Sequence, residues 1–227
     1  MAQENLSPEI FQSLFALASQ CAKSIGVDQW QCYRDQLSDE DAKERRNLSY
    51  CLYILDKVLC WTSGTFPSIA ISDIHIDSTT IAPDDSATVH LVARTELAAI
   101  EETIYLEIYA NQVKPKTEDQ VRQLVTKLLR RLQDWLADSV VDLDDVENGS
   151  DSSAWKIELA IYFFCAQLLL VWPYKDHPDV MFQRRVDVAR RCTRLLLRLW
   201  SSTPDEGLHA ALPRLVLSNI HYFRNEW

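Results

Sequence analysis

Tyr53 and Asp56 are the residues of this 227-residue sequence whose types and spacing first suggest chemistry. They are three positions apart, so on a helix they lie next to each other on one face. A buried carboxyl group beside a phenol can act as a general acid or base. The alternative is structural: the carboxylate pairs with an arginine and holds two helices together, which also buries an acid. We favour the structural alternative.

Glu158 is the second acidic candidate, and it lies at the start of a long apolar segment. There it is either a carboxylate that interacts with the dipole of the first helical turn or the lone acid of a cavity. The first alternative fits its position better. If the protein is an enzyme, Asp56 and Glu158 are the residues that we expect to transfer a proton.

Six arginines between residues 179 and 200 could clamp a phosphate group or an acidic partner. The whole chain, however, has 23 basic and 33 acidic residues, a net charge of -10. Nucleic-acid binding depends on Lys and Arg neutralising phosphates, so we expect no direct contact with nucleic acid. We expect the arginines to be solvated or paired with acids of the same chain. They are Arg184, Arg185, Arg190, Arg191, Arg194 and Arg198.

The patterns of common cofactor and metal sites do not occur in the sequence. The four glycines form neither G-x-G-x-x-G nor a P-loop, and the six cysteines contain no C-x-x-C. The five histidines contain no H-E-x-x-H pair. We therefore expect no cofactor and no metal. The first residues lack the basic stretch and apolar run of a signal peptide, so we expect an intracellular protein, nuclear or cytoplasmic, with reduced cysteines.

Helical periodicity dominates the sequence and predicts an all-α fold. The segment from Trp155 to Trp172 is apolar on every side, as in a helix buried inside a bundle or crossing a membrane. Its apolar part is shorter than the ~20 residues that a bilayer requires, so we expect no membrane span. We predict an irregular multi-helix bundle of about seven to nine helices around this buried central helix.

Two segments interrupt the helical pattern. Residues 62–85 contain Gly64, two prolines and alternating isoleucines, and we expect an extended loop that these isoleucines hold on the bundle. Residues 138–151 are rich in acids and end in Asn148-Gly149-Ser150, which is typical of an acidic, mobile loop. Neither side of this loop has enough apolar stripes to close its own core. We therefore expect residues 1–227 to form a single helical domain.

Residues 45–57 (RRNLSYCLYILDK) and 64–69 (GTFPSI) resemble the signature of the fungal-specific transcription factor domain, the middle homology region of fungal zinc-cluster regulators. The family pattern is an Arg pair, an aromatic-rich helix with Y-x-x-D-[RK], and then G-R-P-x-x-I. In this sequence Thr65 and Phe66 stand where the family has Arg-Pro, and the six-cysteine zinc cluster of the family is absent. Segments 104–109, 168–173 and 188–192 also look similar, so the resemblance covers roughly residues 38–223.

The resemblance implies a regulatory, ligand-sensing module that binds a small hydrophobic molecule or a protein partner. Large aromatic rings pack imperfectly around helices, so we expect an apolar pocket between the signature helix and the central helix. The aromatic residues that we expect to line it are Trp61, Tyr105, Tyr109, Phe163 and Trp172.

Two alternatives remain open at this point. The first is a stand-alone enzyme of secondary metabolism, a cofactor-independent isomerase or cyclase built on the same helical domain. The second is a dimerising scaffold, in which the chain forms a homodimer.

We predict that this chain alone does not bind DNA with sequence specificity, because the phosphate-neutralising contribution of so acidic a chain is small. An electrophoretic mobility shift assay at physiological salt is the test. Tight retardation that depends on the DNA sequence would show that the arginine-rich segment reads DNA.

Overall fold

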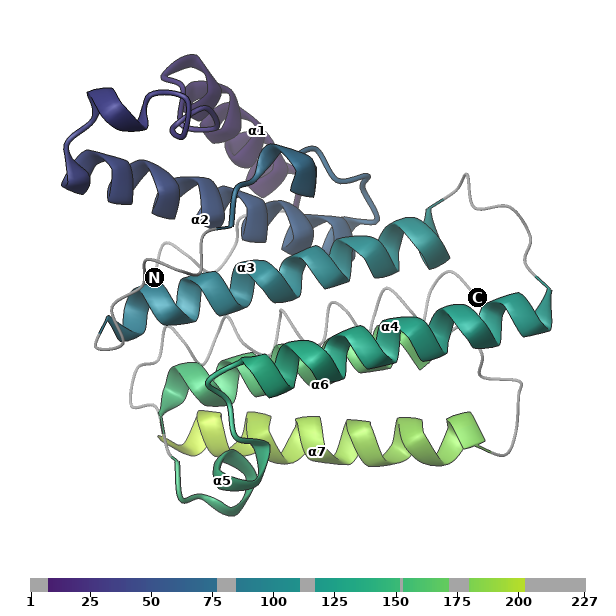
Figure 1. Cartoon of the computed structure of the whole chain (residues 1–227). Coiled ribbons are helices and arrows are strands. Elements are labelled where there is room, and N and C mark those ends of the chain that lie inside the picture. The colour runs from purple at the N-terminus through teal and green to yellow at the C-terminus, as the bar shows by residue number, and fades with distance from the viewer. Residues whose placement is uncertain (1–7, 77–84, 111–116, 152, 172–179, 203–227) are drawn as a thin grey trace. The chain divides into compact units, whose positions relative to one another are not determined.

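The computed structural model describes residues 8–76, 85–110, 117–151, 153–171 and 180–202, which form seven α-helices and short helical turns (Figure 1). No strand occurs in these ranges, and the all-α prediction is confirmed. The chain divides into two compact units, whose described residues meet at Ala98 and Ala99. Each unit is described by itself below, and the organisation as a single domain stays a prediction.

The first unit contains α1 (Pro8–Ser24), α2 (Asp39–Ser63) and the first part of α3 (Ser86–Ile104). Local capping explains the bounds of α2. The Ser38 hydroxyl accepts the N–H of Asp41, which leaves fewer unpaired amides in the first turn. The helix ends at Gly64, whose φ of 66° places it in the left-handed region that glycine adopts easily.

After α2 the chain follows an extended path with a short 3-10 helix at Ile71–Asp73. Ile69 and Ile74 are buried here and Ile76 packs against the same core, whereas Ile71 is exposed. The prediction that isoleucines hold this segment is therefore correct for three of the four, although α2 extends into its first residues. The predicted loop extends to position 85. Of its last part, residues 77–84 lie outside the described residues. The core of the first unit consists of Tyr50, Tyr53, Ile69, Ile74, Val92 and Ala98.

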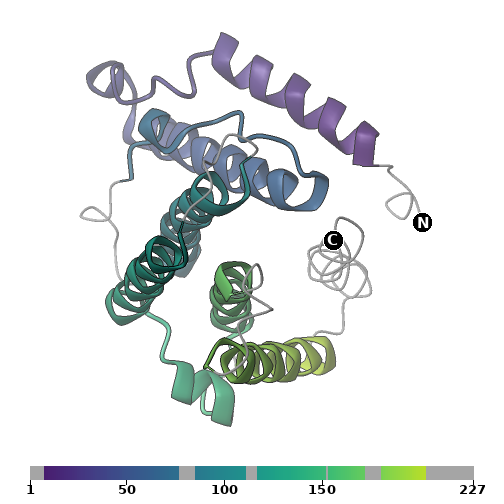
Figure 2. The same ribbon diagram turned by 90° about the vertical axis from the view of Figure 1, so that its right-hand side faces the viewer.

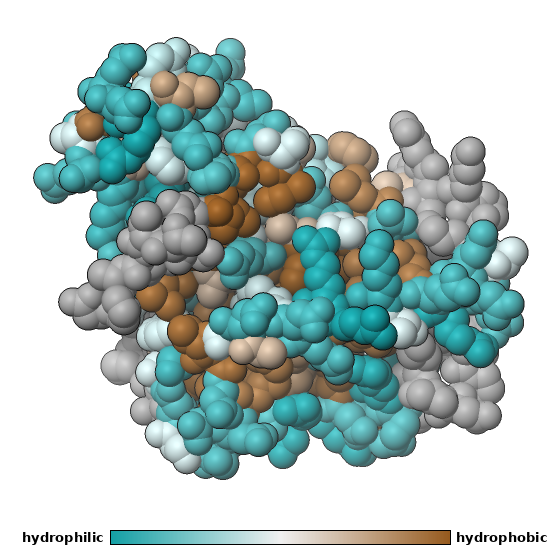
Figure 3. All heavy atoms as spheres, viewed as in Figure 1, coloured by the Kyte–Doolittle hydropathy of each residue, from teal (hydrophilic) through white to brown (hydrophobic). Residues whose placement is uncertain are grey.

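Helix α1 has apolar residues on two neighbouring faces, and its own unit buries only one of these faces. Phe15 packs against the core of the first unit and Ala22 is buried. Ile10, Leu14 and Leu17, on the neighbouring face, are 47%, 50% and 59% exposed. Hydrophobic residues also reach the surface in patches between polar ones on the face drawn in Figure 3.

The second unit contains the end of α3, a π-helical turn at Tyr105–Tyr109, α4 (Glu118–Asp138), α5 (Leu143–Asn148), α6 (Ala154–Val171) and α7 (Val180–Ser202). Helix α6 contacts α4, α5 and α7, and α6 lies beside α7 in both views (Figures 1 and 2). Within this unit α6 is thus the central helix.

Burial along α6 agrees with the prediction of a central helix. Leu159, Phe163 and Leu169 are 0%, 2% and 4% exposed, and the Phe163 ring stacks on Trp135 at 6.0 Å between centroids. By length and composition α6 could cross a membrane, but 67% of it is buried inside the protein. Its apolar surface is therefore covered by protein, as in a core helix. Trp172, the predicted end of this helix, lies outside the described residues.

Residues 138–151 are not the loop that their acidity predicted, because they include the helix α5. The Asp142 carboxylate accepts the N–H groups of Asp144 and Asp145 and so caps this helix. Val146 is completely buried. The acids of the segment thus cap a helix and flank a buried apolar residue.

Arginines of α7 hold α5 in place. Arg191 Nε lies 2.6 Å from Glu147 Oε1, and Arg198 donates to the carbonyl oxygens of Val146 and Asp151. A third arginine of the six, Arg190, pairs with Asp187 of α7 itself at 3.9 Å. This arrangement agrees with the expectation that the arginines pair with acceptors of the same chain.

Candidate functional site

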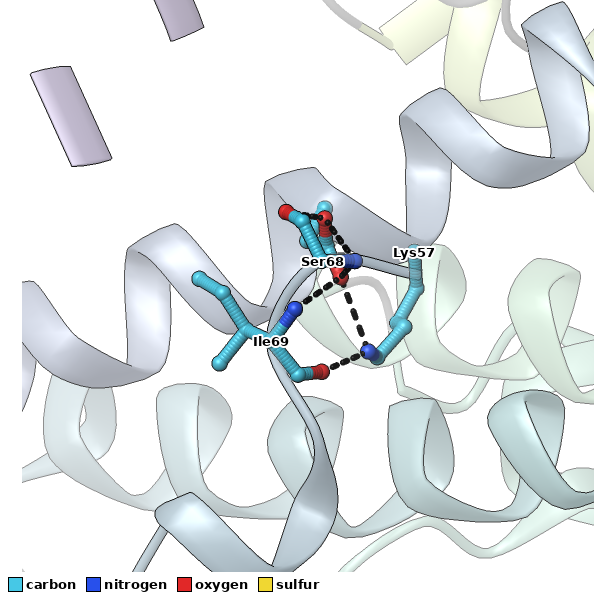
Figure 4. A network of polar contacts seen from close by, with 4 residues as sticks. Lys57, Ser68 and Ile69 are labelled. Atoms are coloured by element: carbon cyan, nitrogen blue, oxygen red, sulfur yellow. Dashed lines mark hydrogen bonds and ion pairs between the residues drawn. The ribbon is translucent and has the colours of Figure 1, made fainter. Parts of the chain in front are cut away.

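The Asp56 carboxylate lies on α2, is almost completely buried, and binds the segment that follows this helix. Its partners Lys57, Ser68 and Ile69 are labelled in Figure 4. Its Oδ1 accepts the Ser68 N–H at 3.1 Å and the Ser68 hydroxyl at 2.5 Å. Its Oδ2 accepts the Ile69 N–H at 3.1 Å and the Lys57 ammonium at 2.9 Å. We call Asp56, Lys57, Ser68 and Ile69 the Asp56 cluster.

Lys57 is the buried cation of this cluster, with a side chain that is 1% exposed. Besides Asp56, its ammonium donates to the carbonyl oxygen of Ile69 and lies 4.3 Å from the centre of the Tyr53 ring. A buried ammonium loses its hydration, and these three contacts offset that loss. The pair thus brings two charges into the core of the first unit with their hydrogen bonds made.

The geometry of the Asp56 cluster supports the structural alternative for Asp56. Oδ1 already accepts two hydrogen bonds and Oδ2 accepts three, whereas a general base needs an oxygen directed at the proton that it removes. The expected partner was wrong, however. Asp56 pairs with the adjacent Lys57 rather than with an arginine, and it joins α2 to residues 68–69 rather than to a second helix.

The same cluster accounts for the sequence pattern by which residues 45–69 resemble the fungal signature. Tyr53, Asp56, Lys57 and Ile69, which are fixed positions of that pattern, are all in contact or hydrogen-bonded here. One turn earlier, the Tyr50 hydroxyl donates to the carbonyl oxygen of His75 at 2.9 Å. In this chain, the residues of the pattern therefore attach the segment after α2 to one face of that helix.

A cavity of about 110 Å³ lies in the first unit between α1, α2 and the segment that the Asp56 cluster holds. Its apolar lining includes Ala22 and Leu52 from the two helices and Ile69 and Ile74 from the segment. The Ser19 hydroxyl also faces this cavity, and it is buried without a hydrogen-bond partner in the described part of the chain. Buried hydroxyls are normally paired, so this one is available to a bound group.

Trp61, Tyr105, Tyr109 and Phe163, the four described residues among the five aromatics predicted to line a pocket, do not line this cavity. Trp61 is buried on α2 in the first unit, whereas the second unit contains Tyr105, Tyr109 and Phe163. Tyr109 is tied to its own unit, since its hydroxyl donates to the Leu169 carbonyl at 2.6 Å. Trp172 lies outside the described residues. The pocket between the signature helix and the central helix stays a prediction.

Glu158 is half-buried on α6, and it is the fifth residue of this helix, whose first turn contains no acidic residue. The structure therefore does not place it in the first turn, where the helix dipole acts most strongly on a carboxylate. Among the described residues, no group of three or more His, Cys, Asp and Glu could hold a metal ion.

Sequence reasoning missed the residues of α1 that line the cavity. The apolar residues between Ile10 and Ile25 predict a helix, but Ser19 and Ala22 do not belong to the stripe that they form. No local pattern indicates that Ser19 and Ala22 meet residues 69–74, which are about fifty positions later in the chain.

We predict that Asp56→Asn lowers the free energy of unfolding by about 3–5 kcal/mol, because it leaves the Lys57 ammonium buried without its counter-charge. The matched control is Asp39→Asn, which removes an exposed ion pair with Arg34 and should cost less than about 1 kcal/mol. Urea denaturation of both variants is the measurement. Equal costs for the two variants would contradict the structural role.

The sequence is 48% identical over 227 residues to transcription factor sphG of Aspergillus fumigatus. The match covers 97% of this chain and 31% of that protein, so the chain spans about a third of the length of its relative. No family model matches the sequence. No solved structure matches it either. The chain is thus similar to part of a fungal transcription factor, in agreement with the coarser expectation from the signature residues.

Proposed function

We propose that the chain is a regulatory, ligand-sensing module of a fungal transcription regulator, acting inside the cell and in the nucleus. The similarity to transcription factor sphG supports the regulatory role. The observation that carries the sensing role is the cavity of the first unit, with its apolar lining and the unpaired Ser19 hydroxyl.

The size and lining of the cavity define the chemistry of the ligand. Pockets for drug-sized molecules have roughly 300–1,000 Å³, whereas an apolar cavity of roughly 150 Å³ binds benzene. At about 110 Å³ this cavity fits a small apolar molecule or the apolar end of a longer one. One hydrogen-bonding atom on that group would pair with the Ser19 hydroxyl.

The position of the cavity gives binding a structural consequence. Its walls come from α1, from α2 and from the segment that the Asp56 cluster attaches to α2. A ligand that occupies the cavity contacts all three, so it stabilises the arrangement in which they lie together. Binding therefore stabilises the contact of α1 with the rest of its unit. A regulatory protein can transmit such a change in stability to its other parts.

The enzyme alternative receives less support. The oxygens of Asp56 are occupied within the Asp56 cluster, and Glu158 does not line the cavity of the first unit. The cavity combines mainly apolar walls with the Ser19 hydroxyl, and the charged residues that also line it, Lys23, Asp28 and Asp73, are exposed to solvent. Such a lining suits the binding of an apolar group.

A binding experiment with phenol and toluene tests the sensing proposal. Both molecules fit the expected size, but phenol alone offers a hydroxyl to Ser19, so we expect it to bind roughly 3–10-fold more tightly. Titration followed by NMR should shift the signals of Leu52 and Ile74, which line the cavity.

Two variants serve as controls for this experiment. Ser19→Ala should reduce the preference for phenol, and Ala22→Leu should abolish binding of both probes by filling the cavity. Shifts that persist unchanged in Ala22→Leu, or the absence of any shift at millimolar probe, would contradict the assignment of this cavity as the ligand site.

We also propose a second role for the exposed face of α1, the contact with a second copy of the chain. Ile10, Leu14, Leu17 and Cys21 follow one another at spacings of four and three residues, as in the seam between two coiled helices. All four are exposed, and monomeric proteins seldom leave such a continuous apolar stripe uncovered.

We predict that sedimentation velocity detects a dimer at micromolar concentrations and that Leu14→Glu reduces the chain to a monomer. The matched control is Leu197→Glu on α7, which changes a leucine that is 66% exposed and lies outside this face. A chain that is monomeric at all concentrations, or a dimer that survives Leu14→Glu, would refute the second role.

A further inference from the structure

Two cysteines face each other across the contact between α6 and α7. Cys165 Sγ on α6 lies 4.0 Å from Cys192 Sγ on α7, within hydrogen-bond distance of two thiols. Cys165 is half-buried, whereas Cys192 is buried. Cys192 belongs to the buried stripe of α7 together with Val188, Leu195 and Leu199.

We propose that Cys165 and Cys192 are a site of reversible oxidation, at which a hydroperoxide converts the two thiols into a disulfide that joins α6 to α7. This proposal is independent of the cavity of the first unit, since both cysteines belong to the second unit.

The distance makes bond formation feasible without separating the helices. A disulfide requires an S–S distance of about 2.05 Å, so the two sulfurs must approach by about 2 Å. Small rotations about the Cα–Cβ bonds provide such a displacement, because they swing each Sγ around its own Cβ. The two helices already contact each other along this seam.

The hydrogen bond between the two thiols favours the thiolate, which is the form that reacts with a hydroperoxide. Donation of the Cys165 S–H lowers the pKa of the Cys192 thiol, although burial acts in the opposite direction. Because a proton can pass between the two sulfurs, the negative charge can also reside on Cys165. This is the sulfur of the pair that solvent reaches more easily.

The reaction needs one equivalent of hydroperoxide. The Cys165 thiolate attacks one peroxide oxygen; the O–O bond breaks, the second oxygen leaves as hydroxide, and Cys165 becomes a sulfenic acid. The Cys192 sulfur then attacks the sulfenic sulfur; the S–O bond breaks and the S–S bond forms. With the two thiol protons, both oxygens of hydrogen peroxide leave as water. Two thiols are oxidised by two electrons, and the peroxide is reduced.

The disulfide would restrain the part of the unit on which α5 depends. Next to Cys192, Arg191 binds Glu147 of α5 and lies 4.7 Å from the ring of Phe164, the neighbour of Cys165. A covalent link at this point ties α7, and with it α5, to the central helix. Oxidation therefore stabilises the folded unit against separation of α7 from α6.

The test uses the full chain with Cys21, Cys32 and Cys51 replaced by Ser, because these exposed thiols would otherwise link different molecules. Treatment with hydrogen peroxide should lower the intact mass by about 2 Da. Proteolysis without reductant should yield a peptide pair that contains Cys165 and Cys192. The melting temperature should rise by roughly 5–10 °C and return to its initial value after reduction.

Cys165→Ser and Cys192→Ser in the same background are the controls, and neither should show the mass loss or the rise in melting temperature. Two single variants keep the test valid if one of them folds poorly. Oxygen addition of about 16 or 32 Da without the linked peptide pair, at every peroxide concentration, would overturn the proposal. A linked pair that leaves the melting temperature unchanged would overturn the restraint of α7.

Discussion

A buried ion pair between two adjacent residues, Asp56 and Lys57, is the interaction on which the described fold of the first unit depends. Burying two charges is costly unless every hydrogen bond of both groups is made. Here the carboxylate accepts the amides of Ser68 and Ile69, and the ammonium binds the Ile69 carbonyl. The pair is therefore stable only while the segment after α2 lies against the helix. Two adjacent residues, Asp56 and Lys57, thus specify a tertiary contact between α2 and the segment that follows it.

The consequences of this contact extend to the core and to the cavity. Once residues 68 and 69 are held, Ile69 and Ile74 reach the core cluster that Tyr50 and Tyr53 form on α2. The same two isoleucines form one wall of the cavity, and α1 covers another side of it. A regulatory ligand at this place would act on an arrangement that is already stabilised by charge. The proposed sensing site thus shares Ile69 and Ile74 with the core of the first unit.

The second unit uses charge differently. Its central helix is almost uniformly apolar, and its charged contacts lie at the periphery, where Arg191 and Arg198 of α7 bind α5. These contacts do not bury an ion pair completely; they position a short helix that is too short to be stable alone. The apolar seam between α6 and α7 contains the Cys165–Cys192 pair, so a covalent change there acts on the main contact of the unit.

Local signals in the sequence predicted the elements well. The uniform apolarity of α6 depends on near neighbours alone, and it agrees with the structure. Ser38 and Thr117, which cap α2 and α4, are local signals of the same kind. The fold class followed from them. The segment around residues 138–151 was different, because a count of acids does not reveal arginines some fifty residues later.

The candidate site was only partly predictable for a related reason. The type and position of Asp56 identified it as a buried acid, but adjacent residues on a helix diverge by 100°, so Lys57 did not suggest itself as the partner. Its long, flexible side chain reaches back to the carboxylate. The cavity depends on contacts between α1 and residues 69–74, and no periodicity in a single sequence encodes such a pairing.

Hydrogen exchange of the backbone amides of Ser68 and Ile69 tests the central claim most directly. Both N–H groups donate to the buried Asp56 carboxylate although they belong to an irregular segment. The account predicts that they exchange as slowly as amides in the middle of α2, because their opening requires the ion pair to separate. Exchange at the rate of an unprotected loop, with α2 still protected, would contradict the claim that this pair holds the segment.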